Sequence, residues 1–174
     1  MRGKILKLTR RQVRERAMSQ IWVCPYDRPI GYQLKDYNGG QDPDAFYCGV
    51  WNPIRKRLTA DCIGLALWAS GIDRKQPGYA GSLGEWLNCS SLLADAHGAM
   101  KFCRPRMSGE AAKVGDWLLT RTHIGVIVRP AFAKGQKHLV VDCSPRHGRD
   151  TGVNTGYAWS TSCEVVTPLF YAEP

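Results

Sequence analysis

The sequence lacks long apolar runs, internal repeats and low-complexity tracts, and these absences limit the kind of protein it can be. No stretch approaches the ~20 consecutive apolar residues of a membrane-spanning helix. The basic N-terminal segment is not followed by the apolar region of a secretory signal, so we expect synthesis in the cytoplasm without export. The 174 residues are enough for one well-formed core, and no linker divides them. We therefore expect a single globular domain.

Cysteine occurs seven times, but without the spacing of a metal site or a disulfide framework. The chain has no C-x-x-C pair, which argues against a zinc ribbon, and an odd number of thiols leaves at least one unpaired. Most of these cysteines are expected to be small buried hydrophobic residues. One mixed set of possible zinc ligands fits no common spacing, so we expect no metal and no other cofactor. Its members are His138, Asp142, Cys143 and His147.

Acidic residues are scarce, and the imbalance is concentrated at the N-terminus. The chain has 24 Lys and Arg against 15 Asp and Glu, and residues 1–16 contain Glu15 as their one acidic residue. Such a segment indicates a virion component or an anionic envelope as partner, or simply a solvated surface. Nucleic acid is a less expected partner, because none of the usual nucleic-acid-binding modules is present. We predict a basic amphipathic helix in residues 1–24 and the single domain in residues 25–174.

Two further helices are predicted before residue 100. Residues 25–60 are rich in Pro, Gly, Asp and Asn and should be irregular, with short helical turns. A buried helix is expected next, capped at its start by Thr59 or Asp61 and ended near Gly71. Another helix is expected within residues 82–97.

The pattern changes after residue 110, and this change indicates the fold class. Short β-branched or aromatic runs, separated by turn-forming residues, predict strands in the segments VGDWLLT, HIGVIVR, HLVVDCS and CEVVTPLFY. Because helices come first and strands afterwards, we expect an α+β fold with an antiparallel sheet built from neighbouring strands.

Cys62 is placed differently from the other cysteines, because it lies in the first turn of the predicted buried helix. A thiolate there faces unpaired backbone N–H groups and the positive end of the helix dipole, and both lower its pKa. A buried core thiol is the alternative at this position. His123 begins the run HIGVIV and is the candidate base, while an exposed histidine at a strand end is its alternative.

Hairpin geometry selects a third residue. The runs HIGVIVR and KHLVVDC should pair so that His123 lies opposite Asp142 or Cys143. A directly opposed carboxylate could orient the imidazole, whereas His138 would lie ~13 Å away along the strands. We therefore predict Asp142 as the partner, provided that the register does not slip by one residue.

Three motifs in this order resemble the NlpC-type cysteine peptidases, which are peptidoglycan hydrolases. Residues 61–65 (DCIGL) resemble the family's D-C-S-G-L nucleophile motif. Residues 113–118 (KVGDWL) resemble its "P-G-D-hydrophobic" strand, and residues 123–126 (HIGV) are similar to its histidine motif. The order and spacing agree over about residues 30–145, which is most of the chain.

Two other segments extend the resemblance. Gly31-Tyr32 and Gly39-Gly40 look like a stretched form of the family's "G-x-x-Y…G-G" segment, and residues 71–75 (GIDRK) match phage-encoded members most closely. The chain departs from the family pattern in two places: Ile63 replaces the usual Ser, and Asp142 stands where His is commoner.

The resemblance implies a fold, a site and a substrate. The fold would be papain-like, with the nucleophile-bearing helix packed on an antiparallel sheet. Cys62 would be the nucleophile, His123 the base and Asp142 the residue that orients it, with Tyr32 lining the cleft and no metal involved. The substrate would be an amide bond of the peptidoglycan stem peptide or cross-bridge, reached after lysis or from within a virion.

Two other functions are compatible with the same sequence. One is a non-catalytic structural or binding module of a phage particle that docks through its basic N-terminal segment. The other keeps the three catalytic residues but changes the reaction partner, giving an acyl transferase with a different acceptor or a toxin that cleaves another amide.

Overall fold

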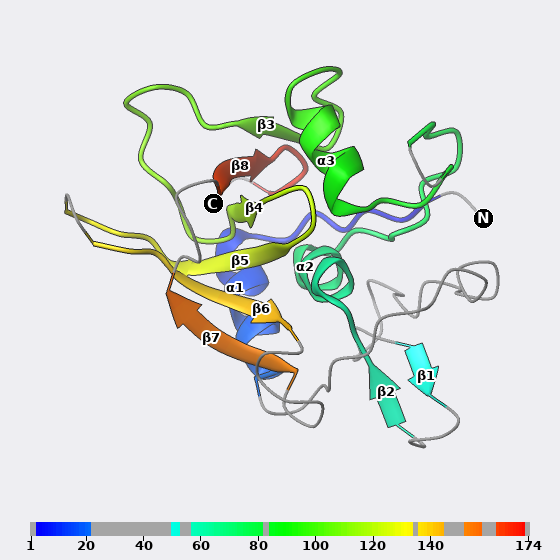
Figure 1. Ribbon diagram of the computed structural model, residues 1–174, viewed down its shortest axis with the longest axis horizontal. Helices are drawn as coiled ribbons and strands as arrows, with labels where there is room; N and C mark the ends of the chain where they lie inside the picture. The colour runs from blue at the N-terminus through cyan, green and yellow to red at the C-terminus, as the bar shows by residue number, and fades with distance from the viewer. Residues whose placement is uncertain are drawn as a thin grey trace.

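Three helices and eight strands make up the described part of the chain, which a computed structural model gives for residues 3–21, 50–52, 57–81, 84–133, 136–144, 152–157 and 163–172 (Figure 1). The helices are α1 (Arg10–Ser19), α2 (Cys62–Ser70) and α3 (Cys89–Ala96). The strands are β1 (Val50–Asn52), β2 (Arg57–Thr59), β3 (Cys103–Pro105), β4 (Trp117–Leu119), β5 (Ile124–Arg129), β6 (Leu139–Cys143), β7 (Val153–Tyr157) and β8 (Glu164–Pro168).

The main sheet has six strands in the order β3-β8-β4-β5-β6-β7, and every neighbouring pair in it is antiparallel. This confirms the predicted α+β class. Strands β4, β5 and β6 are neighbours in both sequence and space, as expected, whereas β7, which pairs with β6, was not predicted from the sequence. The prediction of a sheet built only from neighbouring strands is wrong at one edge, because β8 returns to lie between β3 and β4. Strand β8 pairs with one edge of β4, and β5 pairs with the other edge, so β4 has no free edge.

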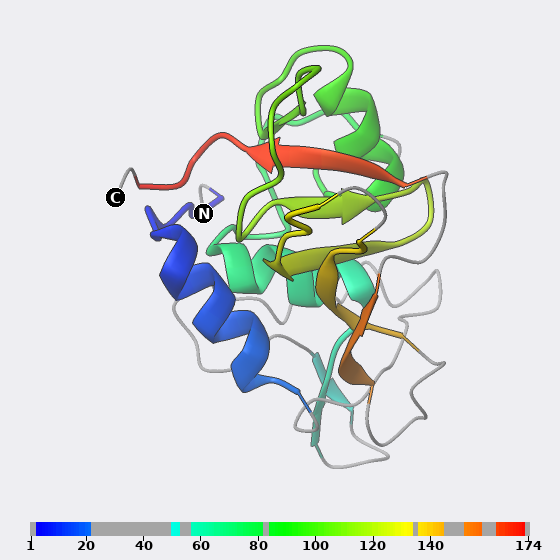
Figure 2. The ribbon, with the colours of Figure 1, turned by 90° about the vertical axis from the view of Figure 1, so that its left-hand side faces the viewer.

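The main core lies between the helices and one face of this sheet. Figure 2 shows α2 lying along the sheet next to β5, with α1 beside it. Val126 and Val141 contribute to this core, whereas Ile127 and Val140 belong to a second, smaller apolar cluster. Because successive side chains of a strand point to opposite faces, the two clusters lie on opposite sides of the sheet. Both faces of the central strands are therefore covered.

Helix α2 is apolar on all sides, and its eight residues from Ile63 to Ser70 are buried. Asp61 caps its start, with its side chain accepting a hydrogen bond from the Gly64 N–H at 2.7 Å. Gly71 ends it with a left-handed backbone (φ 76°), a conformation that glycine adopts without steric cost. The predicted start at Asp61 and end at Gly71 are confirmed. At the far end, Ser70 accepts a hydrogen bond from the Trp117 indole N–H, which ties the helix to β4.

Helix α1 belongs to the same core as the rest of the protein. Val13 and Ala17 are fully buried, and Thr9 and Gln12 form a capping box at its start. Part of its positive charge is engaged inside the molecule, because the Arg10 guanidinium bonds the buried Asp116 carboxylate at 2.7 Å. None of the three helices in the described ranges has the length and apolar character needed to cross a bilayer.

The expectation of an irregular segment over residues 25–60 is wrong at its C-terminal end, where β1 and β2 form an antiparallel pair. Strand β2 leads almost directly into α2. The glycine-rich and proline-rich composition gave no signal for strands of only three residues. Such short strands form because a partner strand is present, and propensity alone does not predict them.

A buried ion pair fixes the start of α2. The Arg74 guanidinium lies 3.1 Å from both carboxylate oxygens of Asp61, and the two side chains are only 4% and 9% exposed. Arg74 also donates a hydrogen bond to the Leu87 carbonyl, just before α3 begins. One side chain therefore holds the first turns of α2 and α3 in place relative to each other.

We predict that Arg74→Ala destabilises the fold strongly, because it leaves the Asp61 carboxylate buried without its cation. The free energy of unfolding should fall by about 3–5 kcal/mol, the usual cost of breaking a buried pair. Urea denaturation would measure this fall. Arg11→Ala is the matched control, because Arg11 pairs with Glu15 on the surface and its loss should change little. Equal effects of the two substitutions would contradict the structural role of Arg74.

Candidate active site

The predicted catalytic residues meet where three backbone segments converge. Cys62 is the first residue of α2, His123 precedes β5, and Asp142 lies near the end of β6. Figure 1 shows β5 beginning and β6 ending beside α2, so the chain brings these positions together from three elements. These three residues are far apart in the sequence, and only the fold brings them together.

The three side chains form a connected chain of contacts. His123 Nε2 lies 2.6 Å from Asp142 Oδ2, and the Asp142 carboxylate is 1% exposed. The His123 ring also interacts with the Cys62 thiol, since each shifts the pKa of the other. A thiol, an imidazole and a buried carboxylate are thus arranged in the order that nucleophilic catalysis requires.

The register of the β5–β6 hairpin differs from the predicted one. Asp142 lies opposite Gly125, so neither Asp142 nor Cys143 lies directly opposite His123. The shift arises because β6 begins at Leu139, opposite Arg129 and later than expected, and the irregularity between Ile127 and Arg129 reduces it by one residue. A displacement by two residues keeps His123 and Asp142 on the same face. The imidazole then reaches Asp142 diagonally, across the position where Gly125 has no side chain.

Electrostatic contacts favour a thiolate–imidazolium pair. A hydrogen bond from Cys89 is the largest cause that lowers the pKa of Cys62; contacts with His123 add to it, and the pKa falls to about 6 although burial opposes the shift. Burial lowers the pKa of His123, but hydrogen bonds and charge interactions with Asp142 and Cys62 outweigh it and raise this pKa to about 9. Between these values the thiol is ionised while the ring stays protonated.

The turn between β4 and β5 holds His123 rigidly. The Thr120 hydroxyl oxygen accepts hydrogen bonds from the backbone N–H groups of Thr122 and His123, and the Thr120 N–H donates to the His123 carbonyl. The Ser90 hydroxyl in α3 donates to the Arg121 carbonyl at 3.0 Å, which ties the turn to that helix. The Thr122 carbonyl oxygen lies 4.0 Å from Cys62 Sγ.

An unengaged backbone donor lies at the thiol itself. Asp61 caps the Gly64 N–H with its side chain and the Leu65 N–H with its carbonyl, but the Cys62 N–H donates to no acceptor in the part of the chain that is described. A free N–H at a helix start can donate to the oxyanion that forms when a nearby thiolate attacks a carbonyl.

Cys89 is the residue at this site that sequence reasoning missed. It begins α3 as Cys62 begins α2, it is 6% exposed, and its thiol shifts the pKa of Cys62. The signal was present in part, because Asn88 caps α3 with a capping box that includes Ser91. That pattern predicts a second cysteine at a helix start, but only the packing of the two helices brings the thiols together.

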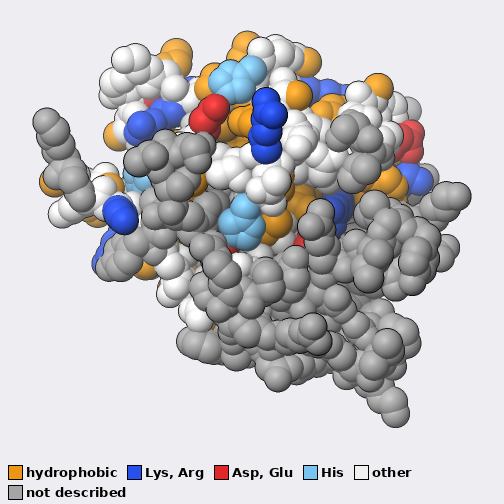
Figure 3. Space-filling model, in the orientation of Figure 1, with side chains coloured by type: hydrophobic (Ala, Val, Ile, Leu, Met, Phe, Trp, Pro, Cys, Tyr) orange, Lys and Arg blue, Asp and Glu red, His pale blue; other side chains and the backbone are white. Residues whose placement is uncertain are grey.

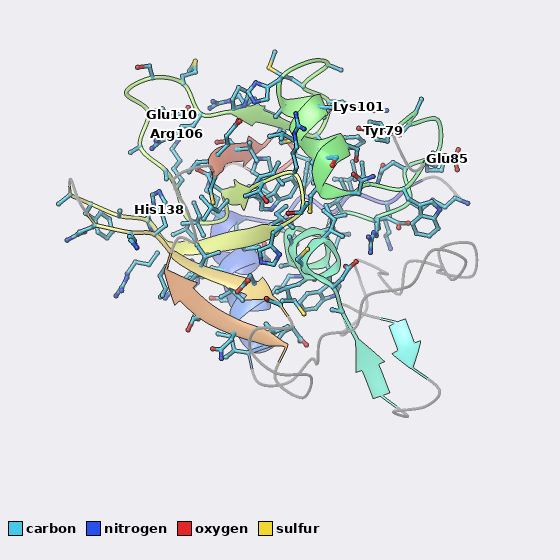
Figure 4. All side chains as sticks on the ribbon, viewed as in Figure 1. Tyr79, Glu85, Lys101, Arg106, Glu110 and His138 are labelled. Atoms are coloured by element: carbon cyan, nitrogen blue, oxygen red, sulfur yellow. The ribbon has the colours of Figure 1, made fainter. Side chains whose placement is uncertain are left out.

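Of the other residues considered in the sequence, the structure places His138 away from this site (Figure 4) and does not describe Tyr32 or His147. His138 is near the tip of the β5–β6 hairpin, away from α2 (Figure 4), and its Nδ1 accepts a hydrogen bond from the Ala131 N–H. Tyr32 and His147 fall outside the described residues. Among the residues that are described, no three His, Cys, Asp or Glu side chains are grouped so that they could hold a metal.

A cleft of about 850 Å³ lies over α3 and the β4–β5 turn, and it reaches Thr122, the residue before His123. Residues of α3, the β4–β5 turn and Glu164 line it, and Thr122 connects it to the Cys62 thiol. Figure 3 shows histidine, acidic, basic and hydrophobic side chains gathered on this face, over α3 and the turn. Arg121 lines the cleft with an exposed guanidinium that pairs with no described residue. The cleft thus offers both apolar contacts and a free positive charge.

We predict that limiting iodoacetamide alkylates Cys62 ahead of the other cysteines at pH 6 to 7. Its thiol should ionise with a pKa of about 6, whereas burial raises that of Cys103 beyond the neutral range. The pH dependence of labelling, followed by peptide mapping, should show a single step near pH 6. His123→Ala should move this step to higher pH because the imidazolium is lost, and Asp142→Asn should move it less. Preferential labelling of Cys163 would overturn the assignment.

Comparisons with known proteins identify no relative of this chain. No protein-family model matches the chain, and no curated protein or solved structure matches it either. The chemistry of the site therefore rests on the geometry of Cys62, His123 and Asp142 and on the local backbone that holds them.

Proposed function

We propose that this protein is a cysteine peptidase or amidase that cleaves an amide bond of peptidoglycan. The observation that carries the proposal is the contact of Cys62, at the start of a buried helix, with a histidine bonded to the buried Asp142. A papain-like fold is part of the proposal, supported by the packing of α2 against an antiparallel sheet. The resemblance of residues 61–65 and 123–126 to the NlpC-type motifs supports peptidoglycan as the substrate.

The first half of the reaction forms a thioester. The Cys62 thiolate attacks the amide carbonyl carbon, a C–S bond forms, and the carbonyl electrons move to oxygen, where the Cys62 N–H stabilises the charge. When the intermediate collapses, the His123 imidazolium gives its proton to the departing amine nitrogen and the C–N bond breaks. The buried Asp142 carboxylate keeps the ring oriented throughout.

The second half regenerates the thiolate. Neutral His123 takes a proton from water, the resulting hydroxide attacks the thioester carbon, and the C–S bond breaks to release the carboxylic acid. The proton stays on His123, which restores the starting ion pair with Cys62. The cycle needs only groups of this chain and water.

The alternative of a non-catalytic docking module has less support, because part of the positive charge of the N-terminal segment is used inside the molecule. Arg10 and Arg16 of α1 are both engaged inside the molecule, with Asp116 and with the Trp68 carbonyl and ring. These contacts use part of the positive charge to pack α1 against α2 and the sheet. An acyl transferase would share the thioester of this site and differ only in the acceptor, so product analysis separates it from a hydrolase.

We predict that the purified protein releases soluble muropeptides from sacculi and that Cys62→Ala does not. Loss of the nucleophile should reduce the rate by at least about 10³-fold. Mass spectrometry of the products would identify the bond and would reveal water or another nucleophile as acceptor. Cys163→Ser serves as the control, because it removes a half-buried thiol that lies outside the site. If wild type and Cys62→Ala leave several wall chemotypes equally intact, the peptidoglycan proposal is wrong.

Arg121 leads to a prediction about substrate charge. Its guanidinium lines the cleft one residue before Thr122, so it can pair with a carboxylate close to the scissile bond. A cleaved peptide with a carboxylate there should have a kcat/KM about ten-fold above that of its carboxamide analogue, as expected for one charge-assisted hydrogen bond.

Arg121→Gln should abolish this preference, while Arg129→Gln, which removes an exposed charge at the other end of β5, should retain it. Steady-state kinetics with the two peptides would measure both effects. A preference that survives Arg121→Gln would show that another group selects the carboxylate.

A further inference from the structure

Two thiols meet in front of His123, and the proposed mechanism uses only one of them. Cys62 and Cys89 are the first residues of α2 and α3, the two helix starts that Arg74 links, and each thiol shifts the pKa of the other. Arg74 holds this arrangement, because it pairs with the Asp61 cap of α2 and donates to the Leu87 carbonyl before α3. The contact between the thiols therefore rests on a rigid, buried support.

The two cysteines differ in exposure. Cys62 is half-buried, whereas Cys89 is 6% exposed and packs within the main core. A reagent from solvent consequently reaches Cys62 first. Cys89 can then react only with what has formed on Cys62.

The two cysteines also differ in ionisation. Cys62 is the thiolate of the pair, and the pKa of Cys89 is raised, first by its hydrogen bond with Cys62, then by burial and by the charge of Cys62. When the Cys62 sulfur becomes a neutral sulfenic acid, the negative charge that suppresses ionisation of Cys89 disappears. Oxidation of the first thiol thus makes the second a better nucleophile.

We propose that Cys62 and Cys89 form a reversible disulfide when the protein meets a peroxide, and that this modification switches the nucleophile off. The chemistry follows from the paired thiols alone, while the activity that it would control is that of the proposed function. Here Cys62 is the peroxide-reactive cysteine and Cys89 the resolving cysteine.

The reaction balances in two steps. The Cys62 thiolate attacks a peroxide oxygen, an S–O bond forms, the O–O bond breaks, and the released hydroxide takes the proton of His123 to become water. The Cys89 sulfur then attacks the Cys62 sulfur, an S–S bond forms, and the S–O bond breaks. Hydroxide leaves with the Cys89 proton as a second water. The sulfurs lose two electrons, the peroxide gains them, and an added dithiol reverses the change.

The other described cysteines are held in different contacts, and Cys163 packs against the second apolar cluster. The Cys103 thiol donates to the Leu92 carbonyl at 3.4 Å, and that of Cys143 donates to the Ala60 carbonyl at 3.2 Å. Both are fully buried. Cys89 is therefore the thiol that the fold places against Cys62.

Hydrogen peroxide added to the reduced full-length protein tests this proposal. Free thiols are then blocked with N-ethylmaleimide, and peptides are mapped under non-reducing conditions. We expect a cross-linked peptide pair containing Cys62 and Cys89, with a loss of two titratable thiols per molecule. Dithiothreitol should restore full alkylation of Cys62. A stable sulfenic or sulfinic acid on Cys62 in the wild type, or a disulfide to any other cysteine, would overturn the proposal.

Cys89→Ser identifies the resolving thiol, because serine keeps a hydrogen-bond donor beside Cys62. In this variant peroxide should carry Cys62 on to sulfinic and sulfonic acids, and dithiothreitol should no longer restore alkylation. Cys103→Ser is the matched control, since it replaces another buried thiol beside α3 and should behave like the wild type. Full recovery of alkylation in Cys89→Ser would exclude Cys89 as the partner.

These readouts are independent of peptidoglycan cleavage. A disulfide that forms in a protein without activity on sacculi would leave the thiol switch intact and refute the proposed function. If peroxide does not inhibit cleavage of sacculi and no cross-linked peptide forms, the proposed function is supported and the thiol switch is refuted.

Discussion

The buried ion pair between Asp61 and Arg74 is the constraint on which the site depends. Asp61 caps the helix that carries Cys62, and a carboxylate this deeply buried is tolerable only with its cation in contact. Arg74 extends the same support to Leu87, at the approach to α3. Without this pair the two helix starts would have no common anchor. Their thiols would then not be held together in front of the histidine.

The reactivity of Cys62 arises from several weak effects that act in one direction. The helix start supplies unpaired N–H groups, Cys89 supplies a hydrogen bond, and His123 supplies a positive charge stabilised by Asp142. Each comes from a different part of the chain, and burial of the sulfur opposes them all. A low thiol pKa is therefore a property of the assembled site, and local sequence accounts for only its first contribution.

The contact between His123 and Asp142 tolerates an error in strand register of two residues but not of one. Sequence reasoning set Asp142 opposite His123, and the sheet sets it opposite Gly125. The residue identified is the same, since alternate residues share a face and a diagonal neighbour is within reach of an imidazole. A shift of one residue would have turned the carboxylate away. The small side chain at position 125 is what permits the diagonal contact.

The sequence by itself determined the local elements and the identity of the chemical groups. The cap at Asp61, the helix end at Gly71 and the β-branched runs of β5 and β6 are short-range patterns, and they predicted α2 and the pairing of β5 with β6, although not its register. Tertiary structure decided what depends on pairing between distant segments. It inserted β8 beside β4, formed strands too short for propensity to predict, and placed Cys89 against Cys62. The reason is physical: capping and periodicity act over a few residues, whereas strand order and helix packing are set by burial of the whole chain.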